Sequence, residues 1–418
     1  MRFKSLPFFL LLTIILTGCF STSPTQSSYE SHTTPINSHE IETTIEAVAV
    51  TESAAPLPFT ILYAGDDITR AMYEPATGTY LGAWLWHGIS KPEFETTVDK
   101  KHAVFAMEMT LGNDFPTTWI LQSIAAQAAP LIILQLPDTA AEDFPLVELT
   151  MFAHELGRFN LPVFIVFNPL PPGSNIQPED YVLLFRYTRI IFRTYAPMAA
   201  FVWHSSDTSA TPQCPMYPGH DMVDWVSISL TAPQGPEGFI YDITALLAPF
   251  YVSFQQYKPI MILPIGISHF SRRDYVYRVP QAAAEIMRVY ETIKDSFPRV
   301  RLLVYANNGL TTPQGDDFSI TREEVTIEAY RSAIADNHFI SRLEPGGGEG
   351  PMWLLSPLRG YYHEGQVFID REIVPAGLRR IPSAFVSEIN ERSYVEISAI
   401  SGLEFVVDHA RRVIFVTG

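Results

Sequence analysis

Eight short apolar runs, spaced across the central part of the chain, constrain its fold more than any other feature. The runs are Gly82–Trp86, Ala103–Met107, Leu131–Leu136, Val163–Phe167, Ala199–Trp203, Val223–Ser229, Ile260–Leu263 and Val300–Tyr305. Amphipathic stretches lie between most of them, at 119–128, 144–159, 181–194, 244–256 and 281–296. Such runs are typical of strands that are buried on both faces of a parallel sheet. The alternation predicts an α/β fold, a (β/α)8 TIM barrel, over residues 57–343.

An open, doubly wound sheet is the alternative that the same alternation leaves. In that architecture a glycine-rich phosphate-binding loop commonly follows the first strand. The sequence has no such loop and no Gly-x-Ser-x-Gly motif, which favours the barrel and predicts no cofactor.

Residues beyond the barrel form a further module in this interpretation. The run Gly346–Gly350 lies within a predicted glycine-rich linker at 344–350. After it, residues 351–418 alternate turns with strand-like segments at 366–369, 404–407 and 412–416. These features predict a small, separate α+β domain.

The first nineteen residues have the pattern of a secretion signal. Arg2 and Lys4 precede an apolar run from Leu6 to Leu16, which is too short to span a bilayer. The following Leu-Thr-Gly-Cys resembles the lipobox of bacterial lipoproteins. The resemblance implies that Cys19 is lipidated and that the chain is extracytoplasmic and anchored to the bacterial cell membrane. An ordinary secreted protein with a chance cysteine is the alternative.

Residues 20–56 are rich in Ser, Thr and Glu, and no Lys or Arg occurs between Lys4 and Arg70. Such a segment buries too little apolar surface to offset its ordering entropy, which predicts a disordered tether. The net charge of −17 disfavours nucleic acid and leaves a polysaccharide or an envelope protein as the partner. The eleven histidines show no metal-ligand spacing. His220, Asp221 and Asp224 are better explained as a turn than as an ion site.

The barrel segment resembles glycoside hydrolase family 26, the β-mannanase type, over about residues 79–343. The resemblance depends on local motifs at 178–186, 201–206, 217–226 and 258–262, of which Tyr217–Val226 is the most specific. In that family two glutamates follow strands four and seven and act as acid/base and nucleophile. The corresponding positions here are Leu170 and Pro264. Because neither side chain ionises, the resemblance implies a glycoside hydrolase-like pseudoenzyme with no catalytic residue of its own.

Other residues near the strand ends are candidates for ligand binding. Flat aromatic side chains there can stack on sugar rings, and polar ones can bind hydroxyl groups. The candidates are Trp86, His87, Glu108, Trp203, His204, Asp221, Tyr305 and Asn307. The competing interpretation makes the aromatics core residues, Trp225 above all, and the polar groups solvated loop residues. Glu108 is the best candidate for a relocated carboxylate.

The C-terminal module resembles the copper amine oxidase N-terminal-like (stalk) domain. The matching residues are Ser393–Gly402, Asp408 and Arg412–Val416. The resemblance implies a spacer or interaction role at the cell wall, without copper chemistry.

Together these observations predict an envelope lipoprotein that binds a cell-wall polysaccharide or β-glycan without cleaving it, or that acts as an envelope scaffold. Two alternatives remain. One is an active glycoside hydrolase with relocated acids such as Glu108, Asp221 or Asp316. The other is a scaffold that binds only proteins.

Overall fold

The structure is a computed structural model that describes residues 55–65, 68–86, 88–135, 145–168, 176–238, 240–309, 315–350 and 352–417. The predicted signal peptide, with Cys19, and all but the last two residues of the predicted tether lie outside these ranges. Within them, no helix combines the length and the apolar character needed to cross a membrane.

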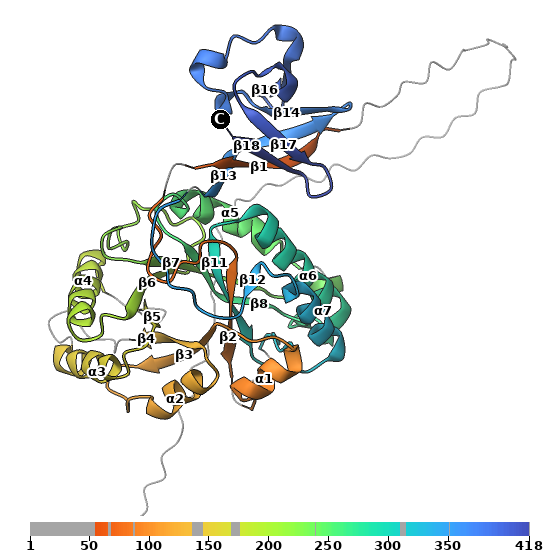
Figure 1. Cartoon of the computed structure of the whole chain (residues 1–418). Coiled ribbons are helices and arrows are strands. Elements are labelled where there is room, and N and C mark those ends of the chain that lie inside the picture. The colour runs from red at the N-terminus through yellow and green to blue at the C-terminus, as the bar shows by residue number, and fades with distance from the viewer. Residues whose placement is uncertain are drawn as a thin grey trace, which may run out of the picture. The chain divides into compact units, whose positions relative to one another are not determined.

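Eight parallel strands form a closed barrel (Figure 1). In order around the barrel they are β2 (Thr79–Leu85), β3 (Val104–Thr110), β4 (Ala129–Gln135), β5 (Val163–Asn168), β6 (Ala199–Ser205), β7 (Trp225–Ala232), β8 (Ile260–Ile267) and β11 (Val300–Asn307). The pairing of β11 with β2 closes the ring, and the short β12 (Phe339–Ile340) also pairs with β2. The predicted (β/α)8 barrel is therefore confirmed, and the open sheet is excluded.

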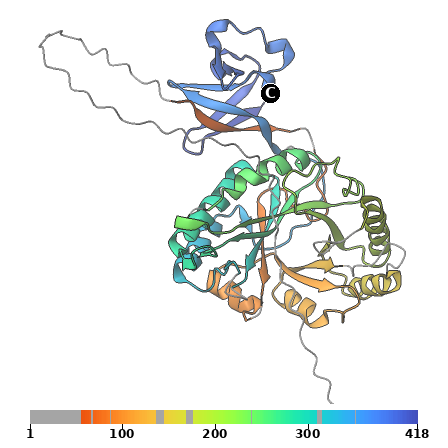
Figure 2. The same cartoon turned by 180° about the vertical axis from the view of Figure 1, so that it is seen from behind.

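Seven helices of the described chain surround these strands, as the view from behind also shows (Figure 2). They are α1 (Lys91–Val98), α2 (Thr117–Ala125), α3 (Leu146–Arg158), α4 (Pro178–Tyr195), α5 (Ile243–Phe254), α6 (Val279–Ser296) and α7 (Glu324–Ile334). Residues 206–224, all of which are described, connect β6 to β7 without a helix. A hairpin of two short strands, β9 (Phe270–Ser271) and β10 (Val276–Tyr277), follows β8.

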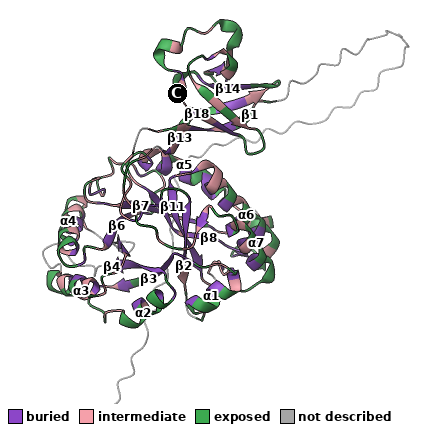
Figure 3. Cartoon of the chain, viewed as in Figure 1, coloured by how far each residue is buried: buried purple, intermediate pink, exposed green. Residues whose placement is uncertain are grey.

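Two apolar layers hold the barrel together. Alternate strand residues face inward and form one layer, which includes Phe164, Trp225 and Met261. The residues between them face outward and pack under the helices. The buried strands and the exposed outer faces of the helices are visible in Figure 3. This period of two decides which strand residues can reach the barrel mouth.

The amino-terminal end of the barrel is closed by the segment 68–74. The indole of Trp225 donates a hydrogen bond to the carbonyl of Met72 at 2.8 Å. Glu74 is fully buried, and one of its carboxylate oxygens lies 3.1 Å from Nε of the equally buried Arg299. Residues 71–74 therefore cover this end of the barrel with buried side chains.

The C-terminal domain is one seven-stranded sheet in the order β15-β16-β14-β13-β1-β18-β17. The strands are β1 (Leu57–Ala64), β13 (Trp353–His363), β14 (Gln366–Asp370), β15 (Val386–Ile389), β16 (Arg392–Glu396), β17 (Glu404–Asp408) and β18 (Val413–Thr417). An additional domain is confirmed, and its helical pieces in the described residues are the 3₁₀ turns 371–373, 376–378, 383–385 and 397–399.

The predicted start of the barrel at residue 57 needs correction. Strand β1 pairs antiparallel with β13 and parallel with β18, so it belongs to the C-terminal sheet. The chain therefore passes twice between sheet and barrel. The two passages bind each other, because the amides of Ile68 and Arg70 donate to the carbonyls of Gly350 and Gly348 at 3.0 and 2.7 Å. The predicted linker is thus one of two connecting segments, and the two are hydrogen-bonded to each other.

Candidate functional site

The carboxyl-terminal end of the barrel carries the polar residues of the inward-facing rows. Near the ends of β2, β3 and β4 these rows include Trp84, Glu108 and Gln135. On β6 and β7 they include His204 and Ser229. Active sites of this fold lie at this end, so these side chains define the barrel mouth.

A pocket of about 430 Å³ opens over the ends of β2 and β3, next to α1 and α2. Three tryptophans line it, and the rings of Trp84 and Trp86 have centroids 6.2 Å apart. The side chain of Trp86 is 39% exposed, which is unusual for tryptophan. We call this the tryptophan pocket; its lining residues are Trp84, Leu85, Trp86, Ile89, Ser90, Lys91, Phe105, Ala106, Met107, Glu108, Trp119 and Gln122.

Glu108 is held in place on the barrel side of the tryptophan pocket. The side-chain amide of Gln135 donates to its carboxylate, and the hydroxyl of Thr110 donates to the amide oxygen of Gln135 at 3.2 Å. Partial burial raises the pKa of Glu108, and the hydrogen bond from Gln135 opposes this rise. The carboxylate is accessible to solvent. It is therefore an oriented acceptor for the hydroxyl groups of a ligand.

Lys91 forms another wall of the tryptophan pocket. It is the first residue of α1, whose start is fixed by a capping box between Ser90 and Glu93. Its ammonium group lies 4.1 Å from the ring centre of Trp119 and donates to the carbonyl of Trp119 at 3.1 Å. The residue is only 6% exposed, and burial lowers the pKa of its amine to about 8.

His204 lies inside the mouth and is held by two hydroxyl groups. Its Nδ1 lies 2.8 Å from Oγ of Ser227, and its Nε2 lies 3.2 Å from Oγ of Ser229. Because Ser229 donates its proton to the carbonyl of Leu263 at 3.0 Å, we assign the imidazole proton to Nε2. Burial lowers the pKa of His204 to about 4. The ring is therefore a neutral group at neutral pH.

A pair of carboxylates, which most glycoside hydrolases use, is absent from the eight described barrel strands. Glu108 is the single acidic residue in them. Strand β8 was predicted to end near Leu263 but continues to Ile267, so Pro264 lies inside the strand. The peptide bond before Pro264 is cis. Leu170, at the expected acid/base position, lies outside the described residues.

Three of the predicted ligand-binding residues either face away from the mouth or are hydrogen-bonded to other parts of the barrel. Trp203 is buried and packs against Tyr217, with ring centroids 4.9 Å apart. Tyr305 is buried against Tyr330. The amide of Asn307 binds the loop after β11, because its oxygen accepts from the amide of Ile320 at 2.9 Å. These side chains do not line the tryptophan pocket.

Asp221 lies in the turn that leads into β7, before the amino-terminal end of that strand. Nearby, Asp224 is paired with Arg189 at 3.0 Å, and His220 stacks on Tyr257 with ring centroids 4.2 Å apart. This turn therefore lies at the end of β7 that is opposite to the mouth. In the described ranges, no three His, Cys, Asp or Glu side chains gather as metal ligands. His87 is not among the described residues.

Asp316, the remaining relocated-acid candidate, lies in the loop after β11. Its carboxylate is 3.3 Å from Nε of Arg272, and burial raises its pKa while Arg272 opposes the rise. The adjacent Asp317 is fully buried, lies 3.0 Å from Nε2 of His269 and also pairs with Arg322. These contacts join the loops after β8 and β11.

Several residues of the site were not predicted from the sequence. Trp84 was inside a predicted strand, and Trp119 and Lys91 come from helices rather than strand ends. Gln135, Ser227 and Ser229 are the partners that orient Glu108 and His204. The sequence did contain one indication of the pocket. Trp84 and Trp86 are two residues apart in a predicted strand, so their side chains are expected on the same face.

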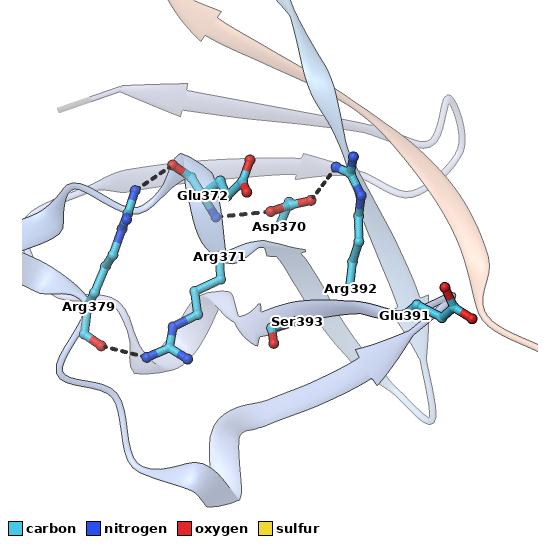
Figure 4. Close-up of a pocket in the computed structure, with 7 residues that line it drawn as sticks. All are labelled: Asp370, Arg371, Glu372, Arg379, Glu391, Arg392 and Ser393. Atoms are coloured by element: carbon cyan, nitrogen blue, oxygen red, sulfur yellow. Dashed lines mark hydrogen bonds and ion pairs between the residues drawn. The ribbon is translucent and has the colours of Figure 1, made fainter.

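A second pocket, of about 460 Å³, lies in the C-terminal domain (Figure 4). Its lining residues are Asp370, Arg371, Glu372, Arg379, Glu391, Arg392 and Ser393. Arg392 pairs with Asp370 at 3.2 Å, and Arg379 donates to the carbonyls of Val374 and Glu372 at 2.7 and 3.1 Å. Three arginines and three acids thus line this pocket, and all three guanidinium groups bind groups of the same domain.

The chain is similar to solved structures of glycoside hydrolases. A family 26 β-mannanase from Bacteroides ovatus shares 12% identity over 63% of this chain and 90% of its own, with a TM-score of 0.47. A GH5-4 broad-specificity endoglucanase from an uncultured bacterium shares 10% identity over 62% and 97%, with a TM-score of 0.43. An exo-β-1,4-mannosidase from an Opitutaceae bacterium shares 12% identity over 63% and 61%, with a TM-score of 0.45.

No protein-family model matches the sequence, and no curated protein matches it. At such low identities and TM-scores, the structural similarities concern the fold alone.

Proposed function

We propose that this chain is an extracytoplasmic lipoprotein whose barrel binds a polysaccharide without hydrolysing it. The observation that carries the proposal is the tryptophan pocket, which Trp84, Trp86 and Trp119 line together with the oriented carboxylate of Glu108. The pocket lies at the end of the barrel where this fold places its ligand sites.

The composition of the pocket suits a sugar. Indole rings offer a flat apolar surface for the C–H face of a pyranose. Each such contact contributes free energy beyond that of the area it buries. Glu108 accepts hydrogen bonds from hydroxyl groups, and its own partner, Gln135, fixes its direction. A polysaccharide supplies both kinds of surface in every unit, which supports this class of ligand over a purely apolar one.

The lone carboxylate supports binding rather than hydrolysis. Proton transfer by a positioned acid contributes about 10²–10⁴-fold to such reactions, and the second carboxylate supplies either the nucleophile or the base. Pro264 occupies the position where the sequence resemblance implies the nucleophile. The described barrel strands provide no second carboxylate beside Glu108, so the described part of the site offers contacts for a sugar ring and one acid rather than a pair.

The remaining parts of the proposal concern location. Lipidation of Cys19, as the lipobox-like tetrapeptide predicts, would hold the barrel at the outer surface of the cell membrane. The C-terminal domain would then act as a stalk or contact module at the cell wall. Fractionation of cells that express the wild type and Cys19→Ser tests this: the variant should leave the membrane fraction or stay unprocessed, and wild type found free of lipid in the medium would contradict the anchor.

Binding is tested with the purified mature chain by isothermal titration against neutral and acidic polysaccharides, with reducing-sugar release measured in parallel. We expect saturable binding without turnover. Trp84→Ala with Trp86→Ala should weaken it by about tenfold or more, because each aromatic contact contributes about 0.5–1.5 kcal/mol beyond its buried area. The control is Tyr187→Ala on the outer face of α4, where the ring is 49% exposed.

Two results would overturn the proposal. Turnover that disappears in Glu108→Gln would establish an active glycoside hydrolase with a relocated acid. Absence of binding to every polysaccharide, in a chain that folds normally, would favour the scaffold that binds only proteins.

A further inference from the structure

We propose that the ligand of the tryptophan pocket is an acidic polysaccharide, and that Lys91 is the counter-ion for a carboxylate on one of its sugar units. This inference rests on the proposed function, because it names the class of sugar that the same pocket takes. It is carried by the position and the contacts of Lys91 rather than by the tryptophans.

The ammonium group of Lys91 is a buried cation without a carboxylate partner among the described residues. The residue is 6% exposed and lines the tryptophan pocket. Its contacts are the carbonyl of Trp119, at 3.1 Å, and the face of the same indole. A buried charge normally has a partner of opposite sign. Here the pocket is the open side from which an anion can approach.

The place of Lys91 in α1 strengthens this argument. It is the first residue of the helix, where the helix dipole favours anions and disfavours cations. Burial, the dipole and the missing partner therefore all oppose the charged amine in the free protein. A ligand carboxylate bound in the pocket next to the ammonium group would offset all three unfavourable effects, because it would form a charge-assisted hydrogen bond with Lys91.

The nearby carboxylates are occupied elsewhere. Glu93 completes the cap of α1 by accepting from the amide of Ser90 at 3.4 Å. Glu95 binds Lys101 at 2.6 Å and accepts from the amide of His102 at 2.9 Å. Glu108 binds Gln135 on the barrel side of the pocket. The pocket thus has a cationic wall and an acceptor wall, which suits a sugar that carries both a carboxylate and hydroxyl groups.

The contacts of Lys91 also hold it in position before a ligand arrives. The indole of Trp119 and the ring of Phe105, at 4.1 and 5.8 Å, fix the side chain from two sides. A fixed lysine loses less conformational freedom on binding than an exposed one. The pocket is therefore organised for an anionic group rather than merely tolerant of it.

The experiment titrates the mature chain with matched pairs of polysaccharides. Each pair consists of an acidic polymer, such as polygalacturonate, alginate or a glucuronoxylan, and the same polymer after its carboxyl groups have been reduced to alcohols. We expect the acidic member of the bound pair to bind about tenfold or more tightly than its reduced form, the size expected for a hydrogen bond to a charged group.

Lys91→Met keeps the apolar stem and removes the charge. It should abolish the preference for the acidic member of each pair, and Lys91→Arg should retain part of the preference. Lys101→Met is the matched control, because it removes one charge from an exposed lysine that follows the same helix. Thermal unfolding of each variant separates loss of binding from loss of folding.

The outcomes distinguish this inference from the proposed function. If the acidic and reduced members bind equally well, or if Lys91→Met and Lys101→Met weaken acidic binding alike, polysaccharide binding stands and the role of Lys91 is wrong. If no polysaccharide of either kind binds, both proposals fail.

Discussion

At the amino-terminal end of the barrel the buried cation Arg299 has a carboxylate partner, whereas at the carboxyl-terminal end the buried cation Lys91 has none within the described chain. Arg299 meets Glu74 at 3.1 Å, and both residues are fully buried. Lys91 lies between an indole and an open pocket. A charge that is neutralised inside the protein stabilises one arrangement of the chain. A charge that is left without a partner at a pocket is available to a ligand.

The same comparison separates the two pockets. In the pocket of the C-terminal domain the arginines bind carbonyl groups and Asp370 from their own domain (Figure 4). In the tryptophan pocket the aromatic surface is exposed and the charged groups on its two walls are not paired with each other. The two pockets have similar volumes. They differ in whether their charged side chains are already bound to other groups of the protein.

The largest expected effect comes from breaking the closed end. Glu74→Gln removes the negative charge and leaves Arg299 buried without compensation, which should lower the free energy of unfolding by about 3–5 kcal/mol. Urea unfolding followed by tryptophan fluorescence measures this. Glu155→Gln, which breaks an exposed pair with Arg158 at 2.9 Å, is the control and should change stability by less than about 0.5 kcal/mol. Equal effects of the two variants would show that the buried pair contributes nothing special.

Acid should also act on the closed end, through His102. Its Nδ1 lies 3.1 Å from the carbonyl of Lys100 and carries the proton, so Nε2 accepts from the hydroxyl of Tyr330 at 3.0 Å. Burial lowers its pKa from 6.5 to about 3. Below pH 6.5 the unfolded chain binds a proton that the folded chain does not, so stability is retained above that pH and lost as the pH falls.

At pH 5 this difference amounts to about 2 kcal/mol for His102, at about 1.4 kcal/mol for each pH unit below 6.5. Unfolding in urea at pH 7 and pH 5 measures the loss for the wild type, to which His204 and His338 add further loss because burial also lowers their pKa values to about 4. His102→Gln should reduce the pH dependence by about 2 kcal/mol whatever its effect on stability at pH 7. His154→Gln, at an exposed position on α3, should leave the dependence unchanged; if the two variants titrate alike, another group is responsible.

The fold could be predicted from the sequence because the barrel strands are buried on both faces, which leaves apolar runs that local pattern detects. Strand β1 could not be assigned in this way. Its partners β13 and β18 lie almost three hundred residues or more along the chain, and nothing near Leu57–Ala64 indicates which sheet it joins. The separate C-terminal domain was therefore predicted without its central N-terminal strand.

The candidate site was predicted less well, for a reason of register. Trp203 and His204 are neighbours on β6, yet the first packs outward under the helices and the second faces the mouth. A shift of one residue exchanges these roles, and apolar runs do not show which residues face inward. Lys91 and Trp119 were not predicted as site residues because they lie on helices α1 and α2 rather than at strand ends.

A smaller effect is expected from loosening the acceptor wall of the tryptophan pocket. Gln135→Leu removes the amide that orients Glu108 and should weaken polysaccharide binding by about fivefold, or about 1 kcal/mol. Titration calorimetry with the bound polysaccharide measures this. Gln256→Leu is the control, because that amide binds the hydroxyl of Tyr63 at 3.0 Å, away from the mouth. Unchanged affinity in Gln135→Leu would mean that the direction of Glu108 is unimportant for binding.

The smallest effect is expected for a cation that is both paired and open to water. Arg411, in the turn between β17 and β18, lies 3.1 Å from Asp295 of α6 and 3.4 Å from Asp408, but its side chain is 51% exposed. Water screens such pairs, so Arg411→Ala should lower the free energy of unfolding by less than about 1 kcal/mol, and added salt should reduce the difference further. Urea unfolding at low and high ionic strength measures both effects. Arg411→Lys, which keeps the charge, should lie between the variant and the wild type. A loss comparable with that of Glu74→Gln would instead mean that exposure does not separate the cations that stabilise this protein from those that do not, and the contrast between Arg299 and Lys91 would then need another explanation.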